Sequence, residues 1–213
     1  WPLSHTRGFS GHNWRVAINE VAGKERLIAT VSPWDDGAQS TVHSEDGGKT
    51  FKIIKTGLPD YRITKNTMWG RGYPKGLAVD PKDPNIVYLG MDGDAEAGKT
   101  GGGIFKSTDG GLSWNQLPNQ PGSRRIFNGL VVDPTDSKRI FWGACGSGGG
   151  VWRSEDQGNT WKNVFTKENF VWNLHIDSTG VIYATGAQLH CSTDHGATWK
   201  QLTNFKPPLS ITG

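Results

Sequence analysis

Residues suited to contact a sugar occur in several loop-like stretches of the sequence. A sugar ring presents flat C–H faces, on which aromatic rings stack, and hydroxyl edges, which carboxylates and arginines bind. The candidates that combine these properties are Trp34, Asp36, Arg62, Trp69, Arg71, Tyr73, Asp94 and Trp172. The alternative role for the aromatic residues among them is packing inside the fold. These residues predict a glycan-binding surface if the fold brings their segments to one face.

A hairpin motif repeated along the chain organises the sequence. The pattern Ser-x-Asp-x-Gly-x-Thr/Ser-aromatic is satisfied at every position in four copies, which begin at Ser44, Ser107, Ser154 and Ser192. An aspartate at such a corner accepts hydrogen bonds from its own turn, and glycine supplies a positive φ. We predict that the Thr or Ser starts the outgoing strand and that the aromatic residue packs on a sheet face. The predicted structural aspartates are Asp46, Asp109, Asp156 and Asp194.

Short apolar runs around each motif predict β-strands, and no stretch has a useful helical period. One run with a following Asp or Asn precedes each hairpin, at residues 15–19, 76–80, 129–133 and 173–177. Each repeat then holds four strands, with the hairpin motif joining the third to the fourth, and such units are β-propeller blades. The predicted fold is all-β, a single propeller domain over residues 1–213 with four-stranded antiparallel blades at 14–55, 76–118, 129–165 and 173–203.

The hairpins resemble the Asp-box, or BNR, repeats of xyloglucanase-type glycoside hydrolases and, more distantly, of sialidases and sortilin-like receptors. The xyloglucanase group is the most similar, through Gly76-Leu-Ala-Val-Asp-Pro81 with Gly103-Ile-Phe-Lys-Ser-Thr-Asp109, and Gly129-Leu-Val-Val-Asp-Pro134 with Gly150-Val-Trp-Arg-Ser-Glu-Asp156. The resemblance covers residues 14–203. Propellers of this kind usually have six or more blades. The resemblance therefore implies an arc of a larger propeller, completed by further blades of the same parent or of another chain; a closed four-bladed ring is the alternative.

The resemblance also implies catalytic candidates. Glycoside hydrolysis uses two carboxyl groups, one that protonates the leaving oxygen and one that activates water. Xyloglucanase-type enzymes carry an Asp in a short loop after a second strand, where this sequence has Asp92; Asp35 and Asp36 occupy the equivalent loop of the first blade. The family's partner Asp comes from a second propeller, which this chain lacks. Because Asp92, Asp94 and Glu96 miss the EF-hand spacing, we predict no metal site, and we predict no cofactor.

The order of strands in each repeat predicts which face binds a ligand. In a four-stranded meander, the first turn and the hairpin motif share one face, and the second-to-third loops and the blade connections share the other. Function normally lies on variable loops over a rigid scaffold. The ligand face is therefore expected opposite the hairpin motifs, where residues 170–172 also lie. His195, inside a hairpin turn, is expected to act as a spacer.

Composition excludes several classes of protein. The 23 Lys and Arg against 20 Asp and Glu give a net charge of +3 without a basic stripe, so nucleic-acid binding is not predicted. No apolar run of about 18 residues exists to span a membrane. Cys145 and Cys191 lack C-x-x-C spacing, so neither a zinc site nor a disulfide framework is predicted. Two cysteines beside 10 tryptophans favour a secreted, extracellular or cell-surface protein.

Two functions fit these residues. The first is a non-catalytic portion of a secreted propeller that binds a glycan or a protein, or serves as a scaffold. The alternative is part of a xyloglucanase-like glycoside hydrolase that cleaves β-glucan-type polysaccharide with paired aspartates. We favour the first for this chain, since the family's catalytic pair cannot be assembled from it alone. Whether the parent protein is an enzyme stays open at this point.

Overall fold

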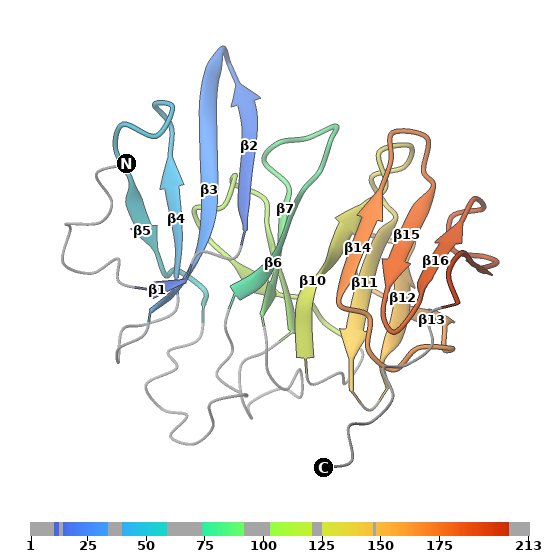
Figure 1. Cartoon of the computed structure of the whole chain (residues 1–213). Coiled ribbons are helices and arrows are strands. Elements are labelled where there is room, and N and C mark those ends of the chain that lie inside the picture. The colour runs from blue at the N-terminus through green and yellow to red at the C-terminus, as the bar shows by residue number, and fades with distance from the viewer. Residues whose placement is uncertain are drawn as a thin grey trace.

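The computed structural model describes residues 11–12, 15–33, 40–58, 74–91, 103–120, 125–146 and 148–204. All regular structure within these residues is β-strand, arranged as four successive units of four strands that we call blades 1 to 4 (Figure 1). Blades 1 and 2 contain β2 (Val16–Val21), β3 (Lys24–Pro33), β4 (Ser40–Ser44) and β5 (Lys52–Ile54), then β6 (Pro74–Val79), β7 (Val87–Met91), β8 (Gly103–Ser107) and β9 (Asn115–Gln116). Blades 3 and 4 contain β10 (Arg125–Val132), β11 (Ile140–Cys145), β12 (Gly150–Ser154) and β13 (Lys162–Phe165), then β14 (Asn173–Ile176), β15 (Ile182–Thr185), β16 (Leu189–Ser192) and β17 (Lys200–Gln201).

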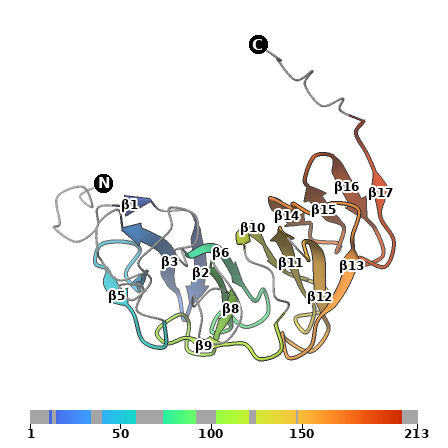
Figure 2. The ribbon, with the colours of Figure 1, turned by 90° about the horizontal axis from the view of Figure 1, so that it is seen from below.

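Consecutive strands of each blade pair antiparallel, and the blades fan out along an arc. Figure 2 shows the first strands of the blades (β2, β6, β10 and β14) along the inner side of the arc and the last strands on its outer side. A single parallel bridge between Asn128 and Asn173 joins β10 to β14, so blades 3 and 4 share one eight-stranded sheet. The short β1 (Gly11–His12), which the sequence analysis did not predict, pairs with the end of β3. The predicted all-β fold of four antiparallel blades in an arc is confirmed.

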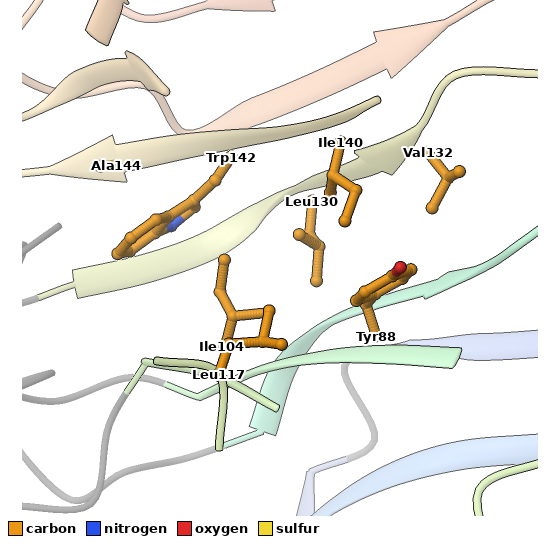
Figure 3. Close-up of a cluster of buried hydrophobic side chains, with 8 residues drawn as sticks. All are labelled: Tyr88, Ile104, Leu117, Leu130, Val132, Ile140, Trp142 and Ala144. Atoms are coloured by element: carbon orange, nitrogen blue, oxygen red, sulfur yellow. The ribbon is translucent and has the colours of Figure 1, made fainter. Parts of the chain in front are cut away.

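The hydrophobic core is divided among the spaces between neighbouring blades. Between blades 2 and 3, Tyr88, Ile104 and Leu117 face a set from blade 3, and all of these side chains are at most 9% exposed (Figure 3). That set is Leu130, Val132, Ile140, Trp142 and Ala144. Because side chains alternate along a strand, each blade offers one apolar face to each neighbour. Similar clusters lie between blades 1 and 2 and between blades 3 and 4.

Each hairpin aspartate is held by its own turn. The Ser44 hydroxyl donates to Asp46 Oδ1 at 2.8 Å, and the Thr50 N–H and hydroxyl donate to Oδ1 and Oδ2 at 2.9 and 2.6 Å. The same three bonds recur at Asp109, Asp156 and Asp194. Such bonds favour the ionised carboxylate, so the pKa of every one of these aspartates lies below its ordinary value.

One detail of the hairpin prediction is wrong. The Thr or Ser of the motif does not start the outgoing strand, because its N–H and hydroxyl are both bound to the aspartate inside the turn. The outer strands begin only after the aromatic residue, as β5 does at Lys52. The fourth strand of each blade therefore starts two residues later than predicted.

The aromatic residues of the motifs join each blade to the preceding one. Trp114 of blade 2 is 1% exposed, and its indole N–H donates to Thr41 Oγ1 of blade 1 at 3.3 Å. Trp161 packs against the cluster between blades 2 and 3. The Trp199 ring of blade 4 lies 5.0 Å from that of Phe165 in blade 3. These contacts fix the angle between blades, and with it the position of the loops at the opposite edge.

Candidate functional site

Phe170 and Trp172 form an exposed, stacked aromatic pair between β13 and β14. Their ring centroids are 5.6 Å apart with planes inclined by 24°, and the side chains are 41% and 43% exposed. Val171 between them is fully buried in the cluster of blades 3 and 4. Neighbouring side chains of an extended backbone point to opposite sides, so burial of Val171 turns both rings toward solvent. We call Phe170 and Trp172 the aromatic ledge.

Backbone hydrogen bonds hold the ledge to both adjoining blades. The Val171 N–H donates to Ala144 O of β11 at 3.3 Å, and the Trp172 N–H donates to Thr185 O of β15 at 2.8 Å. These partners lie at the far ends of the second strands, at the edge opposite the hairpin motifs, which stand at the upper edge of Figure 1. The ledge is therefore a rigid feature of the loop face predicted to bind a ligand.

Polar groups adjoin the inner end of the ledge. Asn173, which follows Trp172, accepts a hydrogen bond at Oδ1 from Arg15 Nη2 at 3.1 Å. Arg15 precedes β2, so the bond joins blade 1 to blade 4 across the inner side of the arc. A guanidinium and an amide beside an aromatic surface offer the donors and the acceptor that sugar hydroxyls require.

Glu168, two residues before the ledge, has a structural role. Its carboxylate accepts from the N–H groups of Ala187 and Gln188 at 3.2 and 3.0 Å, which holds the turn between β15 and β16. Its Oε1 lies 3.9 Å from Nδ1 of the buried His190. Burial lowers the pKa of His190 below its ordinary value, although the Glu168 charge acts in the opposite direction. Glu168 thus ties the segment to the turn between β15 and β16 and leaves the two rings exposed.

Trp172 is the predicted ligand-binding residue that the structure describes. The other predicted ligand-binding residues lie outside the described ranges: Trp34, Asp36, Arg62, Trp69, Arg71, Tyr73 and Asp94. The catalytic candidates Asp35 and Asp92 lie outside them too. The structure adds Phe170 and Arg15 to the surroundings of Trp172. The alternation of aromatic, apolar and aromatic residues at 170–172 was the available signal for Phe170.

The prediction that His195 is a spacer is wrong. Its Nδ1 lies 2.9 Å from Oδ2 of Asp133, a buried carboxylate in the first turn of blade 3. The same oxygen accepts from Arg139 Nη1 at 2.9 Å, and Oδ1 accepts from the Thr135 N–H and hydroxyl. His195 therefore links the hairpin of blade 4 to blade 3. The sequence showed an aspartate after the first strand of three blades but gave it no role.

The described part of the chain has neither a metal-binding cluster nor a membrane-spanning helix. Within it, no group of three or more His, Cys, Asp or Glu is placed to hold a metal ion. Cys145 is buried and its Sγ donates to Val171 O at 3.2 Å, whereas Cys191 is half-buried. The described residues contain no helix that could span a membrane.

Comparison with known proteins relates the chain to xyloglucanases. It is 34% identical to a xyloglucanase of a Paenibacillus species over 168 residues, which are 62% of this chain and 16% of that protein. It is 29% identical to a xyloglucanase of Hypocrea jecorina over 196 residues, which are 88% of this chain and 20% of that protein. The chain thus spans a sixth to a fifth of the length of these relatives. No protein-family model matches it.

Solved structures share the fold. The GH74 xyloglucanase of Xanthomonas campestris superposes with a TM-score of 0.67 at 20% identity, over 93% of this chain and 31% of that one. A GH74 enzyme of Niastella koreensis gives 0.65 at 21% identity, over 90% and 30%. The chain is therefore a partial propeller of the Asp-box type that resembles xyloglucanases in sequence and in fold.

Proposed function

We propose that this chain is a glycan-binding part of a xyloglucanase-like glycoside hydrolase, and that its ligand is a β-glucan-type polysaccharide of the xyloglucan class. The observation that carries the proposal is the aromatic ledge, exposed on the loop face of the arc. The similarity to xyloglucanases over 62% and 88% of the chain supports the choice of ligand. This reading joins the binding role favoured from the sequence to the hydrolase alternative.

The ledge fits a β-glucan chain through stacking. Equatorial substituents leave both faces of a β-glucose ring as flat C–H surfaces, which dock on the exposed faces of the two rings. Trp is well suited to stack on a hydrated sugar, because its ring is large and its side chain loses little conformational entropy on binding. Arg15 and Asn173 would bind hydroxyl groups beside the stacked rings. Xyloglucan would thus bind the ledge without any change in the backbone conformation of this chain.

The hydrolytic residues belong to the same proposal. Asp92 is the proposed acid or base contributed by this chain, and Asp35 is the second candidate. The other carboxyl group would come from a part of the parent protein beyond this propeller. We also propose that the parent protein is secreted or held at the cell surface, where it would have access to polysaccharides. Further blades of the parent would complete the propeller.

Binding is tested by calorimetric titration of the chain with xyloglucan oligosaccharides. The Trp172→Ala variant removes one stacking ring and should weaken binding about tenfold, which corresponds to roughly 1.4 kcal/mol. Leu112→Ala is the matched control, because Leu112 is 38% exposed on the hairpin of blade 2, away from the ledge. Equal affinity in wild type and Trp172→Ala would contradict the role of the ledge.

Hydrolysis is tested by release of reducing ends from xyloglucan. The parent protein and its Asp92→Asn variant are compared, with the isolated chain alongside. Loss of turnover with retained binding supports Asp92 as an acid or base. Turnover that survives Asp92→Asn removes that residue from the mechanism, and binding without any turnover by the parent leaves the chain a non-catalytic glycan binder.

A further inference from the structure

The aromatic ledge belongs to residues 168–172, a segment bound to blade 3 on one side and to blade 4 on the other. On the side of blade 3, Phe170 forms an isolated antiparallel bridge with Cys145 at the end of β11. The Cys145 Sγ donates to Val171 O at 3.2 Å, one residue further along the segment. On the side of blade 4, the Trp172 N–H donates to the last residue of β15. The backbone of the ledge is therefore fixed between two blades.

Three glycines make room for this segment. They come from β11, from the turn before β12 and from the turn after β15: Gly143, Gly149 and Gly186. A Cβ added to each would collide with Val171 Cγ1 at 2.7 Å, with Asn169 O and with Phe170 O at 2.6 Å, respectively. None of the three has a φ in the left-handed region, so no turn conformation requires glycine there. The close approach of the ledge segment accounts for the three glycines.

The turn after β15 holds the segment through both its glycine and its N–H groups. The Cβ position of Gly186 lies 2.9 Å from Glu168 Oε2, and that carboxylate accepts from the N–H groups of the two residues that follow the glycine. The Glu168 side chain is 13% exposed, so its bonds are sheltered from water. Phe170 O belongs to the same planar peptide as the Val171 N–H, which donates to Ala144 O. Anything that displaces this carbonyl therefore moves the backbone between the two rings.

We propose that Gly186 and Glu168 are positioning residues for the ledge, which hold Phe170 and Trp172 in the arrangement that binds a glycan. The inference rests on the glycan-binding role proposed above. Rings held in place before the ligand arrives lose little conformational freedom on binding, so the affinity exceeds that of the same rings on a loose segment. Neither positioning residue has to touch the ligand. A role in turn stability alone would leave the affinity of the folded chain unchanged.

Amide hydrogen exchange of the unliganded chain measures the positioning directly. Gly186→Ala pushes on Phe170 O, so the Val171 and Trp172 amides should exchange about tenfold faster, because opening of this segment becomes easier. Gly23→Ala is the matched control: Gly23 lies in the hairpin of β2 and β3, with φ at +75° and open space at its Cβ position. It strains the backbone away from the ledge and should leave both amides unchanged. Unchanged exchange in Gly186→Ala, or an equal rise in Gly23→Ala, overturns the positioning role.

Calorimetric titration with xyloglucan oligosaccharides then measures the consequence for binding. Gly186→Ala should bind about tenfold more weakly than wild type, a loss similar to that of Trp172→Ala, whereas Gly23→Ala should bind like wild type. Glu168→Ala should bind more weakly too, and Glu168→Gln, which keeps one acceptor oxygen and adds no volume, should recover part of the loss. The two Glu168 variants carry the test if Gly186→Ala does not fold.

The outcomes separate this inference from the proposed function. Wild-type affinity in Gly186→Ala and Glu168→Ala, beside weakened binding by Trp172→Ala, overturns the positioning role and leaves the ledge as the binding surface. A wild-type chain that does not bind the oligosaccharides removes the proposed function, and this inference with it.

Discussion

Asp133→Asn should destabilise the chain strongly although it keeps the number of non-hydrogen atoms in the side chain. The Asp133 carboxylate is fully buried between blades 3 and 4. It accepts four hydrogen bonds: two from Thr135 at 2.8 and 2.6 Å, one from Arg139 at 2.9 Å and one with His195 at 2.9 Å. An amide retains one acceptor oxygen and places an NH₂ group where the second oxygen stood. The amide NH₂ would face N–H or O–H donors that now bind the carboxylate, so these hydrogen bonds are lost and donor–donor repulsion replaces them.

The expected loss of unfolding free energy is about 3 kcal/mol. Removal of one partner from a buried ion pair costs roughly 3–5 kcal/mol. The value should fall at the lower end because Arg139 is not left without a carboxylate, since two others lie 3.7 and 3.8 Å from its guanidinium. Urea unfolding followed by tryptophan fluorescence measures the difference, and the slope of the transition checks that two-state behaviour is kept.

Asp136→Asn is the matched control. Asp136 lies 3.7 Å from the same Arg139, but its side chain is 46% exposed, so the change should cost less than about 1 kcal/mol. If Asp133→Asn costs no more than Asp136→Asn, the buried carboxylate does not hold the two blades together and the reasoning fails.

The difference between wild type and Asp133→Asn should also depend on pH. Burial alone raises the pKa of Asp133, but the bonds from Thr135, Arg139 and His195 outweigh it and hold the pKa below its ordinary value. A carboxyl group whose pKa is lower in the folded state stabilises the fold above its unfolded pKa, about 3.9. That contribution is lost as the pH falls through the folded pKa. The two proteins should therefore converge in stability below about pH 4, and a constant difference would refute this account.

Three further predictions concern the hairpins and their surroundings. Trp161→Ala should lose about 3 kcal/mol of unfolding free energy in urea, because the indole packs between blades, and a loss under about 1 kcal/mol would contradict that packing. Gly150→Ala should lower the unfolding free energy by about 3 kcal/mol, since φ is +111° and a Cβ would meet a backbone carbonyl of the outer strand. Gly148→Ala is the comparison: φ is +75° there and a Cβ would enter open space, so the loss in the same urea experiment should be about 1 kcal/mol. Hydrogen bonds, of which that from the Thr198 hydroxyl is the largest contribution, lower the pKa of Asp194 to about 2. The ionised Asp194 should therefore stabilise the fold fully above about pH 4 and lose this effect toward pH 2. If Asp194→Asn shifted the midpoint of urea unfolding equally at pH 7 and pH 2, this account would be contradicted.

The repeated parts of the fold could be predicted because they obey local rules. Asp46 and Thr50 lie four residues apart and bind each other within one turn, so the motif alone defines the corner. Short apolar runs give the strands, and repetition of the whole unit gives the propeller. Such information is short-range, and the sequence displays it directly.

The site was harder to predict because it depends on contacts between distant residues. Arg15 and Asn173 are 158 positions apart, and His195 and Asp133 are 62 apart, so neither pair follows from a motif. The exposure of Trp172 depends on where Val171 is buried, which in turn depends on the packing of blade 3 on blade 4. Register within a blade could be inferred from the pattern, but contacts across blades required the angle between them.

The same residue type serves two purposes at opposite edges of the arc, and this separates stability from binding. Trp161 points into the space between blades and contributes to the core, whereas Trp172 is turned outward by the buried Val171. Because both are tryptophans, substitution by alanine removes the same side-chain volume at both sites. The two variants therefore differ only in where the removed indole lies. Trp161→Ala should reduce stability without a specific effect on xyloglucan affinity, and Trp172→Ala should reduce affinity at nearly unchanged stability. If one substitution impaired both properties equally, the rigid core and the loop face would not be independent, and the ledge would have to be reassigned to the packing of blade 4.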